Sequence, residues 1–457
     1  MGSITRIENS RHRISFDTEE SASRTSRSLH FEPCSKRKPE GSIQNKMGSR
    51  GIEPRSSGPK PLILSIKLRA LDFTIHNLFK TLFILFAMRL DKKFWATAFT
   101  LTGTVIGAGI LGLPYVFAKS GFFVGLFWLI FLGIITIYFN LALGEVTLRT
   151  KGVHHLPGLA EKYLGKTGKK IMFFAMAFGI YSALLAYLVG EGESLSKIIF
   201  GNSNYALHLG FVFWIGMTFL LREGLKGLKK VETWGVIVII LIILGIFVWM
   251  FPQANFGNLN SFDKTKLFFP FGVVLFSLLG FSSIPELRRE IKGKEKYLKK
   301  AIIVGMLIPV VLYILFAFSF VSVLGNSVPE VATLAFGNII LLLGIFTMMT
   351  SYFVLSFVLK EVFTYDFYER KFIRFFFVSI FPIILYFVII FFKFTDFVNI
   401  LNLGGVVSGG LSAILILIMN LKAKKLGNRK PEYSIKINWF IIVVLSLVFL
   451  LGVFSFF

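Results

Sequence analysis

The chain has 457 residues and a formal charge of +25, yet 54% of its residues are hydrophobic and only 16% are charged. This excludes a nucleic-acid-binding protein, which would be rich in charged residues, and a soluble enzyme, whose apolar stretches would be interrupted every few residues. Apolar stretches of about twenty residues, the length that crosses a bilayer, predict an all-α polytopic membrane protein.

The first 87 residues differ in composition from the rest of the chain. Residues 1–60 are rich in Ser, Arg, Glu and Pro, which is typical of a disordered tail. No apolar core follows a short basic start, so we expect no secretory signal peptide. Residues 71–88 are apolar but short, and we predict an amphipathic helix that lies in the membrane interface.

A second interpretation is that this extension is spurious. The tetrapeptide Gly51-Ile52-Glu53-Pro54 resembles the translated complement of a transfer-RNA gene's T-arm. On this hypothesis the protein starts at Met88. Both interpretations predict a membrane domain over residues 88–457 and place residues 1–87 outside it.

Eleven apolar stretches bounded by charged residues are predicted to span the membrane. Their order and the charges between them also predict an orientation, because Lys and Arg are retained on the cytoplasmic side. The stretches cover residues 95–118, 122–148, 171–199, 205–221, 234–251, 267–285, 301–324, 334–359, 373–392, 397–420 and 438–456.

With the N-terminus in the cytoplasm, the five loops on that side hold 27 of the 50 Lys and Arg residues. The outer side holds only five, which are Lys119, Lys197, Lys264, Lys266 and Lys393. This asymmetry predicts a multi-pass protein of the cell membrane with a cytoplasmic N-terminus and an external C-terminus. The predicted cytoplasmic loops are 149–170, 222–233, 286–300, 360–374 and 421–437.

The first predicted span is crowded with residues that break helices. It contains Gly103, Gly107, Gly109, Gly112 and Pro114. In a helix interior, Gly costs about 1 kcal/mol and Pro about 3 kcal/mol relative to Ala. Their concentration predicts an unwound stretch within the membrane.

The sixth predicted span carries Gly280 and Pro285 at the same five-residue spacing as Gly109 and Pro114 in the first. The two spans cross the membrane in opposite directions, and each opens a group of five. This pattern predicts an inverted repeat of five plus five spans. Interrupted helices at matching positions of such a repeat indicate the binding site of a transporter.

Unwinding a helix frees backbone groups that need a cavity or a ligand. The N–H groups that start a half-helix after Gly109 suit a carboxylate, and the freed carbonyl groups suit an ammonium group or a sodium ion. The sequence therefore predicts a site for a zwitterion built with few charged side chains. The alternative for Gly107, Gly109 and Gly280 is close helix packing. That packing role is our prediction for Gly125, Gly133, Gly179, Gly245 and Gly344.

The stretch GTVIGAGILGLPYVFAKSGF at 103–122 resembles the first-helix signature of the amino acid/polyamine/organocation superfamily, and GFSSIPE at 280–286 resembles its sixth helix. Within it, residues 92–456 are similar to the amino acid/auxin permease family and the related aromatic amino acid permeases. The resemblance implies a leucine-transporter-type fold of about eleven helices, with the first and sixth broken. It also implies ion-coupled uptake of amino acids by alternating access, with no enzyme activity and no cofactor.

The resemblance also implies which residues bind the substrate. The unwound part of the first helix contacts the substrate carboxylate, and Phe281 packs over the substrate as a thin gate. Tyr187 in the third span lies where this fold often lines its site, with a packing or lipid-facing role as the alternative. The implied substrate-binding residues are Gly107, Ala108, Gly109, Ile110, Tyr187, Phe276, Gly280, Phe281 and Ser282.

Two coupling ions, sodium and the proton, stay open. The resemblance implies a sodium site formed by carbonyl groups of Gly103 and Ile106 and hydroxyl groups of Thr350 and Ser351. Oxygen-only ligation suits a hard cation. The alternative is that these hydroxyl groups bond their own helix backbone.

Intramembrane acids are the candidates for proton coupling. Glu145, Glu286 and Glu361 lie at the cytoplasmic ends of spans, where we expect neighbouring Lys and Arg to pair with them. Glu191 and Glu193, near the outer end of the third span, are therefore the predicted protonation sites.

Other functions of a polytopic membrane protein fit less well. A divalent-metal transporter needs Asp, Asn, His or Met at the breaks, and an ion channel needs a selectivity ring. An intramembrane enzyme needs paired acids or a metal cluster within the spans. A non-transporting amino acid sensor of the same fold stays open. The predicted partners are a neutral or aromatic amino acid and the lipid bilayer, with no nucleic acid and no prediction of oligomeric state.

Overall fold

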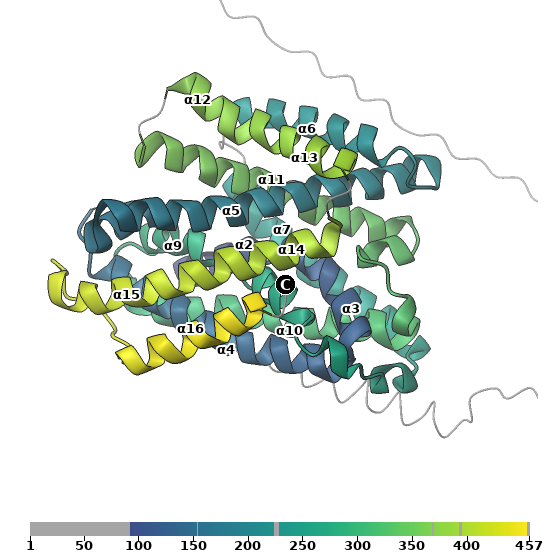
Figure 1. Ribbon diagram of the computed structural model, residues 1–457, viewed down its shortest axis with the longest axis horizontal. Coiled ribbons are helices and arrows are strands. Elements are labelled where there is room, and N and C mark those ends of the chain that lie inside the picture. The colour runs from purple at the N-terminus through teal and green to yellow at the C-terminus, as the bar shows by residue number, and fades with distance from the viewer. Residues whose placement is uncertain (1–91, 153, 224–227, 368–369, 393–394, 455–457) are drawn as a thin grey trace, which may run out of the picture. The chain divides into compact units, whose positions relative to one another are not determined.

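The computed structural model describes residues 92–454 except 153, 224–227, 368–369 and 393–394, and its regular elements are all helical (Figure 1). Residues 1–87 and the predicted interfacial helix at 71–88 lie outside the described residues. The helices are α2 (Lys92–Val105), α3 (Gly109–Ser120), α4 (Phe122–Leu148), α5 (Leu156–Phe200), α6 (Ala206–Glu223), α7 (Leu228–Met250), α8 (Pro270–Ser277), α9 (Ile284–Glu290), α10 (Leu298–Leu324), α11 (Asn338–Tyr365), α12 (Lys371–Phe375), α13 (Phe381–Phe392), α14 (Phe397–Gly404), α15 (Gly410–Leu426) and α16 (Trp439–Phe454).

Each of the eleven predicted spans corresponds to one helix or to one interrupted helix. The first span is α2 with α3, and the sixth is α8 with α9. In the ninth and tenth, π-helical turns at Phe376–Ile380 and Gly405–Gly409 join α12 to α13 and α14 to α15. Among the described residues, eight helical segments are long and apolar enough to cross a membrane, or nine with the bent pair α2 and α3. The remaining two, α6 and α16, are shorter apolar helices.

Large apolar side chains cover the outside of several helices. On α4, for example, Phe123, Phe127, Ile130 and Ile134 recur along one face and are exposed. A soluble protein rarely leaves so broad an apolar surface uncovered, whereas lipid acyl chains cover it at no cost. The protein is therefore a multi-pass membrane protein.

Helices from the two halves of the chain share one core. α5 packs against α6, α11, α14 and α15, while α10 packs against α2, α4 and α7 (Figure 1). α2 to α7 form the first five spans and α8 to α15 the second five, while α16 packs on α15. The predicted five-plus-five architecture with broken first and sixth helices is confirmed.

The start of the third span differs from the prediction. α5 begins at Leu156, well before the predicted residue 171, and Gly165 breaks it with a φ of 78°. The added segment is amphipathic, because Leu156, Leu159, Ala160 and Tyr163 recur at helical spacing and are all buried. The predicted loop 149–170 is therefore mostly helical.

The basic loops lie at one end of the helices, which we call the basic end. Arg288 Nη1 donates to Thr150 O at 2.7 Å, which joins the loop after α4 to α9. Arg429 Nη1 donates to Leu148 O at 2.9 Å, which joins the loop after α15 to the end of α4. Both contacts pair an Arg with a helix-end carbonyl group, which supports the predicted grouping of these loops on one side.

Glu145 holds the segment between α15 and α16 against α4. Its side chain is fully buried, and its Oε1 accepts from Arg149 Nε and from Ser434 Oγ, both at 2.8 Å. Its Oε2 accepts from Ile435 N at 2.9 Å and from Asn420 Nδ2 at 3.2 Å. The expectation that neighbouring basic residues pair with this acid is confirmed.

We expect Glu145→Ala to lower the free energy of unfolding by about 3–5 kcal/mol, because it leaves buried donors and a cation without their acceptor. Thermal unfolding in detergent would measure the loss. Glu432→Ala is the matched control, since Glu432 pairs with Arg429 at the surface and such pairs contribute about 0–1 kcal/mol. An equal loss in both variants would contradict the structural role of Glu145.

Candidate functional site

The first span is interrupted at residues 106–108. α2 ends at Val105, α3 begins at Gly109, and the two helices are bent by 56°. The backbone N–H groups of Gly107, Ala108, Gly109 and Ile110 meet no backbone carbonyl group in the described part of the chain, and that of Ala108 faces the Tyr187 hydroxyl oxygen. These N–H groups lie at the start of α3, where the helix dipole favours an anion.

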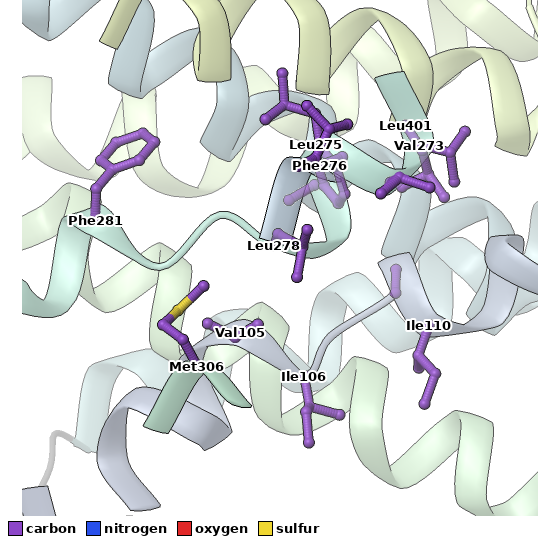
Figure 2. Close-up of a cluster of buried hydrophobic side chains, with 14 of the residues drawn as sticks. Val105, Ile106, Ile110, Val273, Leu275, Phe276, Leu278, Phe281, Met306 and Leu401 are labelled. Carbon is purple, nitrogen blue, oxygen red and sulfur yellow. The ribbon is translucent and has the colours of Figure 1, made fainter. Parts of the chain in front are cut away.

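The second interruption lies beside the first (Figure 2). α8 ends at Ser277, α9 begins at Ile284, and a short 3₁₀ turn at Phe281–Ser283 separates them. An added Cβ at Gly109 would lie 2.5 Å from the Cα of Ser277, so the two interrupted helices cross at backbone contact. Glycine at 109 is required for this crossing.

The equal Gly-to-Pro spacing does not mark equivalent positions in the two helices. α3 begins at Gly109 itself, whereas α9 begins four residues after Gly280. Pro114 lies inside α3, whereas Pro285 is in the first turn of α9. Both spans are interrupted as predicted, but the spacing that suggested it is coincidental.

One side chain from α10 joins the two interruptions. Tyr313 is fully buried, and its hydroxyl group lies 2.9 Å from Val105 O and 3.0 Å from Ser277 O. These carbonyl groups end α2 and α8, so each has lost its partner in the next helical turn. Tyr313 could not be predicted from the sequence, because a lone Tyr in an apolar span carries no signal of such a contact.

A cavity of about 60 Å³ lies at the crossing of the two interrupted helices. Six of the nine predicted substrate-binding residues line it. The rest of the lining is Ser277, Ser408, residues of α5, Leu355 of α11, and Thr104, Val105 and Leu279 beside the two interruptions. The lining contains no charged side chain from the described residues. The six are Gly107, Gly109, Tyr187, Phe276, Phe281 and Ser282.

The other three predicted residues do not line the cavity. Ala108 and Ile110 are buried, so only their backbone N–H groups bear on the site. Gly280 serves helix packing, because an added Cβ would lie 2.7 Å from Val105 Cγ2 and 3.0 Å from Leu101 Cδ1.

Tyr187 lies directly over the first interruption. An added Cβ at Gly107 would lie 2.5 Å from the Tyr187 hydroxyl oxygen and 3.3 Å from Ser351 Oγ. Tyr187 is buried, so it does not face lipid. Its hydroxyl group and the free N–H groups of residues 107–110 therefore converge on one small space.

The glycines predicted to serve packing divide into two groups. Added Cβ atoms at Gly125, Gly133, Gly179 and Gly344 would lie 2.3–3.3 Å from neighbouring side chains. Gly179 also lines the cavity, opposite Ser408. The prediction is wrong for Gly245, because nothing lies within 4 Å of its added Cβ.

The four predicted coupling-ion residues line a second, smaller cavity of about 30 Å³, and Gly235, Val236, Ile239, Phe346 and Val354 form the rest of its lining. Ser351 Oγ lies 3.4 Å from Ile106 O, and Gly103 O has no partner in the described chain. Thr350 Oγ1 donates to carbonyl groups of its own helix at 2.9 and 3.0 Å, which leaves its lone pairs free. A space of this size holds one water molecule or one small ion.

The two predicted protonation sites differ in burial. Glu191 is fully buried and faces the backbone of Met349, with no hydrogen-bond partner for either carboxylate oxygen among the described residues. Glu193 is partly exposed. Glu191 follows Tyr187 by one helical turn on α5 and approaches α11 beside Thr350 and Ser351.

The sequence profile of the tryptophan/tyrosine permease family matches residues 90–456. The chain belongs to this family. Among curated proteins it is 29% identical to tyrosine-specific transport system 1 of Haemophilus influenzae, over 48% of this chain and 55% of that protein. It is 25% identical to glutamine transporter 2 of Aliivibrio fischeri, over 58% of this chain and 68% of that protein. The chain thus spans about half to two thirds of the length of these relatives.

Two solved structures resemble this chain in fold. MhsT in complex with L-phenylalanine aligns with a TM-score of 0.58 and 15% identity, over 81% of this chain and 99% of that one. The Eremococcus coleocola manganese transporter aligns with a TM-score of 0.59 and 12% identity, over 79% and 86% of the two chains. At such low identities the similarity establishes the leucine-transporter-type fold and no more.

Proposed function

We propose that this permease is an ion-coupled symporter of amino acids with neutral, apolar or aromatic side chains. The observation that carries the proposal is the set of N–H groups at residues 107–110 that no backbone carbonyl group accepts, which border an uncharged cavity together with the Tyr187 hydroxyl group. Such a set binds a carboxylate without a basic side chain. Carbonyl groups at the ends of α2 and α8 supply acceptors for the substrate ammonium group.

The rest of the cavity suits an apolar side chain. Met176, Ile180 and Ala183 of α5 and Leu355 of α11 line it, and Phe276 and Phe281 complete the apolar surface. A charged substrate side chain would be buried there without a partner, which is costly. Relatives named for tyrosine, tryptophan and glutamine transport agree with a neutral substrate.

For the coupling ion we propose sodium at the smaller cavity, between the Gly103 and Ile106 carbonyl groups and the Thr350 and Ser351 hydroxyl groups. The polar groups named here are all oxygen atoms, which suits a hard cation, and the size of the cavity suits one ion, although Val236, Ile239, Phe346 and Val354 also line it. Glu191 supports the proton as the second candidate, because a buried acid without a partner in a membrane helix commonly marks an ion pathway.

We further propose that the basic end faces the cytoplasm and that α16 ends on the external side. The excess of Lys and Arg at that end supports this orientation. Labelling of single cysteines, Lys299→Cys or Lys264→Cys in a chain whose Cys34 is replaced by Ser, would test it in intact cells. Reagents that do not cross membranes should label only the position near Lys264.

Uptake into proteoliposomes tests the function. Labelled tryptophan, tyrosine, phenylalanine, glutamine, lysine and glutamate would be offered under separately imposed sodium and pH gradients. We expect accumulation of neutral amino acids and none of lysine or glutamate. Failure of every amino acid to accumulate under either gradient would overturn the symporter proposal. Binding without counterflow would instead identify a sensor.

Two variants distinguish the coupling ions. Ser351→Ala removes one oxygen ligand, and we expect the sodium concentration for half-maximal uptake to rise about tenfold or more, as when one good polar contact of about 1.4 kcal/mol is lost. Glu191→Gln should leave the sodium dependence unchanged. If instead a pH gradient drives uptake, and only when Glu191 is present, the coupling ion is the proton and not sodium.

A further inference from the structure

A third cavity lies among the ends of α6, α11 and α12, away from the two interruptions. Its volume is about 440 Å³. Four basic side chains line it together with Phe375 and the hydroxyl-bearing Thr218 and Ser379. We call it the basic pocket. The four basic residues are Arg222 of α6, Lys360 of α11, and Lys371 and Arg374 of α12.

The basic pocket belongs to the basic end of the helices. Glu361, next to Lys360, lies 3.9 Å from His155 at the start of α5. An added Cβ at Gly158 would lie 3.1 Å from the carboxylate of Asp366, which follows α11. Helix ends at this position lie where the headgroups of a bilayer begin.

Among the described residues, no acidic side chain pairs with the charges of the basic pocket. Lys360 Nζ donates to Leu221 O at 3.2 Å, and Arg374 Nη1 donates to Thr364 Oγ1 at 2.7 Å, so both have neutral partners. The guanidinium group of Arg222 lies 5.5 Å from the ring centre of Phe375. In the described part of the chain, none of the four forms an ion pair.

Four like charges around one cavity repel each other. An anion between them would be attracted to all four, and this attraction would offset the repulsion. Arg binds phosphate oxygens through two parallel N–H groups, and Lys binds them as a point charge. The pocket therefore has the chemistry to bind a phosphate group.

The surroundings of the pocket favour a lipid phosphate over a soluble one. Phe219, one turn before Arg222, is 62% exposed, and Phe372, between Lys371 and Arg374, is 75% exposed. Both lie on membrane-spanning segments, where acyl chains cover apolar side chains. Charges beside exposed aromatic rings match a phospholipid, whose phosphate joins a polar headgroup to acyl chains.

We propose that the basic pocket binds the phosphate group of an anionic phospholipid, with the acyl chains along Phe219 and Phe372. The lipid bridges α6, α11 and α12 by neutralising charges from all three. It is independent of the substrate cavity, so the proposal stands or falls separately from the symporter function.

Binding of defined lipids to the full-length, delipidated protein in detergent tests the proposal. Native mass spectrometry would follow titrations with dioleoylphosphatidylglycerol, dioleoylphosphatidylcholine and inorganic phosphate. We expect phosphatidylglycerol to bind and the other two to bind about tenfold more weakly or not at all. Lys371→Gln combined with Arg374→Gln should weaken phosphatidylglycerol binding about tenfold or more.

Two further variants control this experiment. Lys371→Arg with Arg374→Lys keeps both charges and should keep the binding. Lys299→Gln with Lys300→Gln removes two exposed charges of α10 at the same end and should also keep it. Equal weakening by both Gln pairs would overturn the site in favour of general attraction to the basic end. Equal binding of phosphatidylcholine would show that the pocket does not select an anionic lipid. Equal binding of inorganic phosphate would show that the ligand need not be a lipid.

Discussion

Replacement of Gly107 by alanine is expected to lower amino acid uptake about 100-fold, the scale on which small misplacements in a preorganised site are felt. The added Cβ would lie 2.5 Å from the Tyr187 hydroxyl oxygen and 3.3 Å from Ser351 Oγ. It would thus fill the space between the free N–H groups and the tyrosine, where we place the substrate carboxylate. Initial uptake rates in proteoliposomes, with substrate affinity from binding, would measure the effect.

The folded state should survive this change, because the nearest atom is the end of a side chain and not backbone. Gly109→Ala would be a poorer test, since its Cβ would meet the backbone of Ser277. Gly245→Ala is the matched control: it lies in a membrane helix with nothing within 4 Å of the added atom, so uptake should be unchanged. Normal uptake by Gly107→Ala would show that the substrate does not bind at the first interruption.

The spans and their interruptions could be predicted because their signals are local. A run of about twenty apolar residues predicts a membrane helix wherever it packs. Likewise Gly107, Gly109 and Pro114 in one apolar run weaken that helix whatever surrounds it. The backbone part of the candidate site could be predicted for the same reason, because a break in a helix by itself leaves N–H groups without their helical acceptors.

What the sequence could not predict depends on contacts between distant residues. Gly109 and Gly280 have identical chemistry, yet Gly109 lines the cavity and Gly280 packs against Val105 and Leu101. Ser408 reaches the cavity through a π-helical turn, and no sequence pattern placed it opposite Gly179. The glycine-rich stretch around Ser408 was a signal that the sequence analysis left unused.

The early start of α5 was missed for a different reason. Residues 156–163 bury one face only, and the charged Glu161 and Lys162 on the other face resemble the residues of a loop. A count of apolar residues cannot find such a segment, whereas its helical periodicity could have. Boundaries set by charge alone are therefore least accurate where an amphipathic helix adjoins a span.

Tyr313→Phe is expected to lower the free energy of unfolding by about 1–3 kcal/mol, because it leaves the buried carbonyl groups of Val105 and Ser277 without a donor. It should also lower uptake about tenfold. The hydroxyl group fixes the ends of α2 and α8 relative to each other, and a tenfold change corresponds to about 1.4 kcal/mol of that positioning. Thermal unfolding and initial uptake rates, measured on the same preparation, would give both values.

Tyr386→Phe separates loss of stability from loss of positioning. Its hydroxyl group is also buried, but it lies 3.4 Å from Ala206 O on α6, away from both interruptions. We expect it to lower stability by a similar or smaller amount and to leave the substrate affinity unchanged. If both variants lose stability and uptake in the same proportion, Tyr313 acts only through stability. If Tyr313→Phe alone loses substrate affinity, its hydroxyl group sets the geometry at which the two broken helices meet.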